Sequence, residues 1–227
     1  MRMLLIRHGQ TPSNVLGALD TAAPGAGLTA LGQTQAQAVP TALAAERIAG
    51  IYVSGLVRTH LTAEPLAAVT GLTPRAHEGL NEIAAGAFEM RRDPEAVHAY
   101  VDCAERWARG ELDVTLPGGE SGHEFRHRYE QALRAVALNH PEDATVAVVS
   151  HGAAIRVYAA IALAHDPAAV ENRSLNNTGM VTLEGHLDSG FALRDWVEHP
   201  VGGAHLTGDT EHDVTADPDA APQGVSA

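Results

Sequence analysis

The 227-residue sequence contains no lysine, so all 15 of its basic side chains are arginines. P-loop nucleotide sites, protein-kinase active sites and Schiff-base catalysis each require a lysine, and its absence excludes all three. Arginine is therefore the only cation left to bind phosphate. Its planar guanidinium suits phosphate oxygens well, since it can donate two hydrogen bonds in parallel.

Cysteine is nearly absent too, because Cys103 is the only one. A single cysteine excludes an internal disulfide and a multi-cysteine metal site. Long apolar runs are also missing: no segment approaches the roughly 18 apolar residues that a membrane span needs. The first apolar run, residues 3–6, is interrupted by Arg7 and is too short for a secretory signal. We therefore expect a cytoplasmic protein.

Positive charge is scarce, and the formal net charge is −13. Nucleic acid and anionic membrane surfaces repel an acidic protein, so we expect neither as a partner. Length and an apolar fraction of 45% fit one large domain, which we assign to residues 1–199. Residues 200–227 are rich in Gly, Ala, Asp, Thr and Pro and have no cation, so we predict an acidic, disordered tail.

Strand-like and helix-like patterns alternate along the chain, which indicates a mainly parallel sheet covered by helices on both faces. We therefore predict an α/β fold, a three-layer α/β/α sandwich. The expected strands are 3–6, 51–53, 74–79, 145–149 and a pair at 179–184 and 191–196; the expected helices are 29–47, 56–69, 94–110, 121–139 and one starting near 152.

Two histidine–glycine pairs follow two of these strands. His8-Gly9 comes after the first strand, directly behind Arg7, and Ser150-His151-Gly152 comes after the strand at 145–149. In open α/β sheets such strand ends face the crevice where ligands bind. Two histidines delivered to one crevice beside an arginine predict an anion site that contains a nucleophile, and hence an enzyme acting on phosphate.

The segment Arg7-His8-Gly9 resembles the defining motif of the histidine phosphatase superfamily, which includes cofactor-dependent phosphoglycerate mutases and many broad-specificity phosphatases. Further segments are similar to the other motifs of the family, in the right order from residue 3 to about 196. The resemblance implies a phosphoglycerate mutase-like fold with a small helical cap, roughly residues 83–120, over the site. The segments are Gln10-Thr11 with Asn14, 28–36, 54–59 with Thr62-Ala63, Leu80-Asn81-Glu82-Ile83 with Gly86 and Glu89, 117–121 and 150–152.

The chemistry of phosphate gives these residue types a physical reason. A phosphomonoester is dianionic, so a neutral imidazole is a suitable attacker. We assign this role to His8, which would form a phosphohistidine while its other ring nitrogen donates to a carbonyl. The transferring phosphoryl group spreads charge over three oxygens. Arg7, Arg58 and His151 would bind those oxygens, with Asn14 as a supporting contact.

The leaving alkoxide needs a proton, and we assign Glu82 as the general acid that supplies it. The same carboxylate would then activate the water that hydrolyses phosphohistidine. A glutamate among cations normally has a depressed pKa, so burial or the bound phosphate must keep Glu82 protonated. The arginines stabilise charge as Mg²⁺ does in kinases, so we expect no metal and no cofactor. The expected partner is a small phosphorylated metabolite.

One competing motif is His123-Glu124-Phe125-Arg126-His127, which matches the zinc-protease pattern H-E-x-x-H. Arg126 would oppose Zn²⁺ there, and no third ligand follows at the usual spacing. We interpret the segment as a polar helix face.

A phosphoglycerate-mutase-type transferase and a catalytically silent phospho-ligand binding module remain alternatives. Ala153 follows His151-Gly152 where the mutases usually have a polar residue, and Arg91-Arg92 lacks the flanks of their basic pair. These departures favour a phosphatase. A homodimer through an apolar helix face stays open. Cap cations that could contact a second anionic group of the substrate are Arg91, Arg92, Arg106, Arg109, Arg126 and Arg128.

Overall fold

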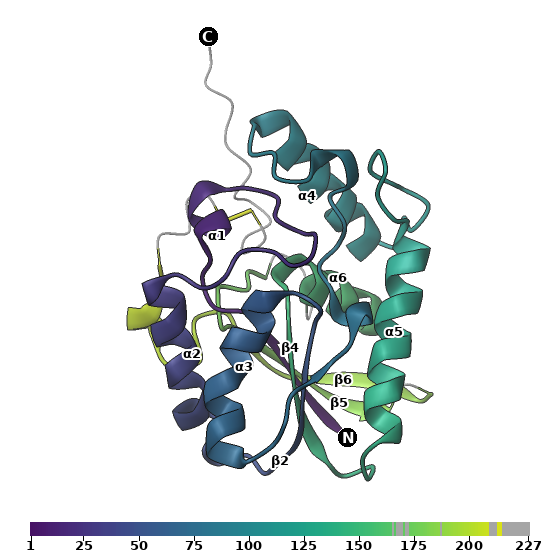
Figure 1. Cartoon of the computed structure of the whole chain (residues 1–227). Coiled ribbons are helices and arrows are strands. Elements are labelled where there is room, and N and C mark those ends of the chain that lie inside the picture. The colour runs from purple at the N-terminus through teal and green to yellow at the C-terminus, as the bar shows by residue number, and fades with distance from the viewer. Residues whose placement is uncertain (165, 167–169, 171–172, 187, 209–212, 215–227) are drawn as a thin grey trace.

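A computed structural model of the chain describes residues 1–164, 166, 170, 173–186, 188–208 and 213–214 (Figure 1). Its centre is a six-stranded sheet with the strand order β3-β2-β4-β1-β5-β6. The strands are β1 (Arg2–Arg7), β2 (Ile48–Val53), β3 (Arg75–Ala76), β4 (Thr145–Ser150), β5 (Met180–His186) and β6 (Gly190–Val197).

The first four strands run parallel, whereas β5 and β6 are antiparallel to their neighbours. The predicted mainly parallel sheet is confirmed, with the expected strand pair at one edge. β1 lies between β4 and β5, and its register pairs Arg7 with Ser150. The residues that follow this pair are His8 and His151, so the register alone sets the two histidines side by side.

Helices cover both faces of the sheet, which gives the predicted three layers (Figure 1). Alternate residues of β1 face opposite sides, as the strand period requires: Leu4 and Ile6 pack under α2 and α3, and Met3 and Leu5 pack on the other side with α5 and α6. The helices are α1 (Pro12–Leu16), α2 (Ala30–Ala42), α3 (Val57–Thr70), α4 (Pro94–Ala108), α5 (Gly122–Leu138) and α6 (Gly152–Ala162).

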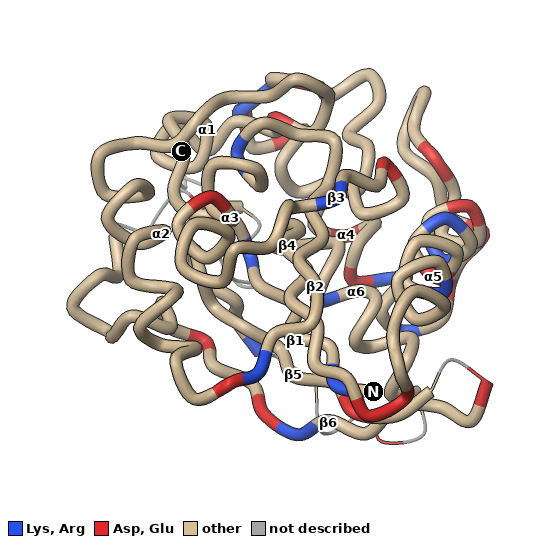
Figure 2. The backbone as a smooth tube through the Cα atoms, turned by 60° about the horizontal axis from the view of Figure 1, so that its bottom comes forward, with Lys and Arg blue, Asp and Glu red and all other residues tan. Residues whose placement is uncertain are grey.

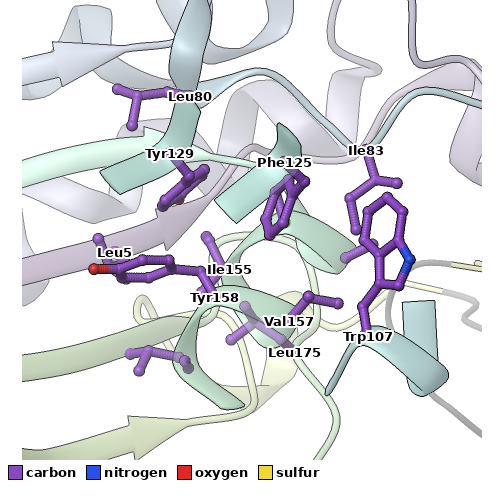
Figure 3. Close-up of a cluster of buried hydrophobic side chains, with 14 of the residues drawn as sticks. Leu5, Leu80, Ile83, Trp107, Phe125, Tyr129, Ile155, Val157, Tyr158 and Leu175 are labelled. Atoms are coloured by element: carbon purple, nitrogen blue, oxygen red, sulfur yellow. The ribbon is translucent and has the colours of Figure 1, made fainter. Parts of the chain in front are cut away.

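A row of aromatic side chains fixes α4, the helix of the expected cap, to the body of the domain (Figure 3). Trp107 of α4 stacks on Phe125 at a centroid distance of 5.7 Å, and Phe125 lies 5.6 Å from Tyr129. Tyr129 in turn lies 4.8 Å from Tyr158 of α6. Such pairs stabilise beyond the area they bury. Acidic and basic residues are interleaved along α5 (Figure 2).

Three local predictions were wrong. The strand expected over 74–79 is limited to β3, and residues 78–80 form a short 3-10 helix. The helix expected over 29–47 begins after its predicted cap, Thr29, but ends at Ala42, because Ile48 already pairs with Thr145 of β4. Between the first expected strand and the helix at 29–47, where the sequence indicated no helix, the structure contains α1. A capping box starts this short helix, in which the Thr11 hydroxyl accepts from the Asn14 N–H and the Asn14 side chain accepts from the Thr11 N–H.

The prediction of disorder from residue 200 is wrong for residues 200–208. The Val201 N–H donates to Thr178 O at 3.1 Å, and Gln35 Nε2 donates to Leu206 O at 2.9 Å. Leu206 is buried, so one apolar side chain anchors a segment whose composition indicated no core. Residues 209–212 and 215–227 of the predicted tail lie outside the described residues. In the described part of the chain, the helices fall short of the length and apolar character that crossing a membrane would require.

Candidate active site

The crevice at the ends of the parallel strands brings together all six residues selected from the sequence. His8 follows β1, and His151 caps α6 directly after β4; their rings lie 5.2 Å apart, centroid to centroid, at 61°. Arg58 lies in the first turn of α3. A small cavity of about 20 Å³ is lined by His8, Asn14, Arg58 and Glu82, among others.

The His8 ring is oriented by its own loop. Nδ1 lies 2.8 Å from Gly9 O, and a carbonyl oxygen only accepts, so Nδ1 carries the proton of the neutral ring. The carbonyl contact expected from the sequence is therefore present, and it leaves the lone pair on Nε2. Burial, and then Arg58 and Arg7, hold the pKa of His8 well below its ordinary value, so the ring stays neutral.

Gly9 is needed because two backbones approach each other closely. A Cβ on Gly9 would lie 2.6 Å from the carbonyl oxygen of Gly32, at the start of α2. The Gly9 N–H donates to Thr62 Oγ1 at 2.9 Å, and the Thr62 hydroxyl donates to Arg58 O at 2.7 Å. The loop that orients His8 is thereby tied to the helix that carries Arg58.

Arg58 is buried, and some of its N–H donors have no partner among the described residues. Its Nη2 donates to Asp20 O at 2.8 Å, and Nη1 lies 3.7 Å from Asp20 Oδ1. Nε and Nη1 have no hydrogen-bond partner among the described residues. Burial lowers the pKa of Arg58, while Asp20 and Glu82 act in the opposite direction. Buried unpaired donors are rare in proteins, and an anion that binds beside His8 would satisfy them.

His151 presents a second unpaired group. Its Nε2 lies 2.8 Å from Ser54 Oγ, and Nδ1 is buried with no hydrogen-bond partner in the described structure. Burial, and then the positive charge of Arg58, place the pKa of His151 well below its ordinary value. A neutral imidazole with one nitrogen held by Ser54 can present the other to a phosphate oxygen.

Arg7 is fully buried, and its contacts include Leu175 O, 2.8 Å from Nη1, and Asp213 Oδ1, 2.7 Å from Nη2. Asn14 donates from Nδ2 to the same Asp213 oxygen at 3.3 Å. The Asn14 Oδ1 accepts from the Thr11 N–H at 2.9 Å, which turns the amide nitrogen toward Asp213. The two phosphate-binding candidates thus share one carboxylate in this structure.

Glu82 lies at the N-terminus of α6, fully enclosed. Its Oε1 accepts from the N–H groups of Ile83 (2.9 Å) and Ala154 (2.8 Å), and its Oε2 accepts from Ala153 N–H (3.2 Å). These bonds and the nearby Arg58 favour the carboxylate, but burial is the largest effect and raises the pKa of Glu82. Burial was one of the two conditions that the assigned role of proton donor required.

Arg128 of α5 holds the segment that carries Glu82. Its guanidinium donates to Gly79 O (2.8 Å), Asn81 O (2.9 Å) and Glu82 O (3.0 Å), and forms two 2.7 Å bonds to Glu120. Glu120 also accepts from Ala84 N–H at 3.2 Å. The Arg128–Glu120 pair is therefore hydrogen-bonded to the backbone on both sides of Glu82. Arg128 was one of the cations that could contact a second anionic group of the substrate; in this structure its guanidinium binds Glu120 and three backbone carbonyls instead.

Replacing Arg128 by glutamine should impair proton donation by Glu82 more than substrate binding. We expect kcat for an alkyl phosphate to fall about 10²-fold, the cost of misplacing a reacting group by about 1 Å. Turnover of p-nitrophenyl phosphate, whose leaving group needs no proton, should fall much less. Steady-state kinetics on both substrates test this, with Arg134→Gln on the exposed part of α5 as the control. Equal losses on both substrates would indicate a structural role only.

Several residues around the site were not selected from the sequence. Ser54 and Thr62 lie in the segments matched to the family, but they gave no chemical signal of their own. Asn177 donates to His8 O at 3.1 Å and to Asn14 Oδ1 at 3.3 Å. Asp213 came from the predicted tail. In the rival zinc motif, the Glu124 carboxylate accepts from the Ser121 N–H and hydroxyl and caps α5.

The site lies at the ends of the parallel strands. It combines a buried neutral histidine, a second histidine, two buried arginines and a buried carboxyl group, an arrangement typical of phosphoryl-transfer sites of the histidine type. The chain matches the sequence pattern of the histidine phosphatase superfamily (branch 1) over residues 3–199 and belongs to this family. Members of the family include phosphatases and mutases.

Two relatives and one solved structure illustrate this range. The PE-PGRS family protein PE_PGRS11 of Mycobacterium tuberculosis is 37% identical over 216 residues, which cover 88% of this chain but only 37% of that protein. A probable phosphoglycerate mutase, GpmB of Erwinia tasmaniensis, is 30% identical over 217 residues, 94% of this chain and 98% of that one. A mycobacterial glucosyl-3-phosphoglycerate phosphatase in complex with VO3 superposes with a TM-score of 0.73 at 27% identity, covering 86% of this chain and 98% of that chain.

Proposed function

We propose that the chain is a metal-independent phosphatase that hydrolyses small phosphomonoesters through a phosphohistidine at His8. The observation that carries this proposal is the fixed His8 tautomer. The contact between Nδ1 and Gly9 O leaves a lone pair on Nε2 of a ring kept neutral by its surroundings. The unpaired N–H groups of Arg58, together with the unpaired Nδ1 of His151, would face the phosphate and supply the charge stabilisation that phosphoryl transfer needs.

The reaction has two steps. In the first, Nε2 of His8 attacks phosphorus, the bond from phosphorus to the ester oxygen breaks, and the leaving oxygen takes the proton of Glu82. In the second, the Glu82 carboxylate takes a proton from water, whose oxygen attacks phosphorus as the N–P bond breaks. The products are the alcohol and inorganic phosphate, and Glu82 ends protonated as it began.

A mutase-type transferase is the second candidate, because GpmB of Erwinia tasmaniensis matches over nearly its whole length. A mutase must keep the phosphoryl group on the enzyme between transfers and must hold the rest of the substrate. Ala153, whose N–H binds Glu82, carries only a methyl group and offers no side-chain hydrogen bond to a substrate. This favours water as the acceptor.

Acid-quench labelling distinguishes these candidates. The enzyme is mixed with a ³²P-labelled phosphomonoester, quenched and mapped; we expect an acid-labile, base-stable label on His8 that chases into inorganic phosphate. A parallel assay with 3-phosphoglycerate and a bisphosphoglycerate primer should give no isomerised product. Label that passes to an alcohol instead of water would identify a transferase. Phosphate binding with neither label nor turnover across a panel of phosphoesters would identify a binding module.

A further inference from the structure

The buried carboxylate at the anion site comes from the far end of the chain. Asp213 lies 206 positions from Arg7, and its Oδ1 is 2.7 Å from Arg7 Nη2. The Arg7 side chain is 0% exposed and the Asp213 side chain 3%, so this ion pair is screened from water. Residues that form such a pair are not a solvated tail.

The donors that hold Asp213 are those that the proposed reaction requires for phosphate. Arg7 and Asn14 both donate to one Asp213 oxygen, and Asn14 is oriented for this by Thr11 and Asn177. A carboxylate oxygen and a phosphate oxygen make the same kind of charge-assisted bond to a guanidinium. The Asp213 carboxylate therefore holds a place that a phosphate oxygen needs.

The cavity beside His8 is too small for a substrate in this structure. The cavity lined by His8, Arg58 and Glu82 measures about 20 Å³. A volume of roughly 10–15 Å³ in this measure admits one water molecule, so a phosphomonoester does not fit. Val214, the next residue after Asp213, lines a larger cavity of about 760 Å³ between α4, α5 and α6, together with Ala153, whose N–H contacts Glu82. Val214 thus borders the larger cavity, while the neighbouring Asp213 binds Arg7.

We propose that Asp213 is an intramolecular ligand of the phosphate site, which substrate must displace. The inference rests on the proposed function in that it takes Arg7 and Asn14 as phosphate ligands. Simple loss of Asp213 would break a buried ion pair of Arg7, which is costly. Arrival of a phosphate dianion replaces one anion with another, so the exchange is coupled to binding. Asp213 thereby competes with substrate and inorganic phosphate.

Competition of this kind weakens apparent affinity by the fraction of molecules whose site is vacant. With the carboxylate bound about 90% of the time, its removal tightens phosphate binding about tenfold. Isothermal titration calorimetry with inorganic phosphate measures this on the full chain. We expect Asp213→Asn and Asp213→Ala to tighten binding, and KM for p-nitrophenyl phosphate to fall in parallel with little change in kcat.

Asp188→Asn is the matched control, because it also removes one negative charge but from an exposed pair with Arg134. Unchanged or weaker phosphate binding in both Asp213 variants would overturn the inference, and would make Asp213 a structural partner of Arg7. Calorimetry requires no turnover. Tighter phosphate binding by an enzyme that never becomes labelled at His8 would therefore refute the proposed function while supporting the displacement of Asp213.

The unaltered protein offers a second test that does not depend on how a variant folds. Hydrogen exchange of a peptide that contains residues 213–214 is followed with and without saturating inorganic phosphate. Displacement predicts faster exchange there when phosphate is bound. Slower exchange would show that phosphate and Asp213 occupy the site together, which contradicts the proposal.

Discussion

Replacing His8 by alanine should lower kcat for p-nitrophenyl phosphate by about 10⁴-fold or more, the usual scale of loss when a covalent nucleophile is removed. The loss is large because the remaining groups cannot form a covalent intermediate. Arg58 and His151 would still bind phosphate, so calorimetry should show retained affinity for inorganic phosphate. Retained binding with lost turnover separates a chemical role from a folding defect.

His123→Ala is the control for His8→Ala, since His123 is 63% exposed and pairs with Asp113 on the surface. Its turnover should equal that of the unaltered protein. Activity of His8→Ala within tenfold of normal would remove His8 from the nucleophile's role. In that case, label mapped to His151 would assign the role to the second histidine, whose pKa is also held low by burial.

Replacing Glu82 by glutamine should have a second large effect, one that depends on the leaving group. Alkyl phosphates need a proton on the departing oxygen, and general acid catalysis contributes about 10²–10⁴-fold to rates. We expect a loss of that size in kcat. With p-nitrophenyl phosphate the first step needs no acid, but phosphohistidine hydrolysis still lacks its base. We expect a burst of p-nitrophenol followed by slow turnover, while the label accumulates on His8.

The pH profile of kcat/KM gives an independent reading of Glu82. The first step requires a protonated Glu82, so activity falls as pH rises through its pKa, which burial raises. It also requires a neutral His8, so activity falls as pH drops through the depressed pKa of that ring. The optimum should lie between the depressed pKa of His8 and the raised pKa of Glu82. Glu82→Gln should lose the alkaline limb, whereas Glu142→Gln, at an 88% exposed carboxylate, should keep it. A limb that persists without Glu82 would belong to another group.

The sequence predicted which candidate site residues lie close together because the positions of the two histidines follow from strand ends. Arg7 and Ser150 are in register, so the residues after them had to meet. Glu82 was selected from a matched motif, but the reason for its raised pKa was beyond the sequence, because burial depends on the packing of α6 and the cap. Asp213 could not be selected at all. It pairs with Arg7 across 206 positions, and it comes from a segment whose composition predicts a solvent-exposed, disordered tail.

The central place of β1 also constrains the order of events during synthesis. β1 leaves the ribosome well before its two neighbours, β4 and β5, which come from residues 145–150 and 180–186. Until those residues have emerged, the apolar stretch Leu4-Leu5-Ile6 lacks its strand partners. Such nascent stretches are where chaperones act and aggregation begins. The loop that carries His8 therefore reaches its place beside His151 only after β4 and β5 are made, and we expect a product truncated before residue 186 to be inactive.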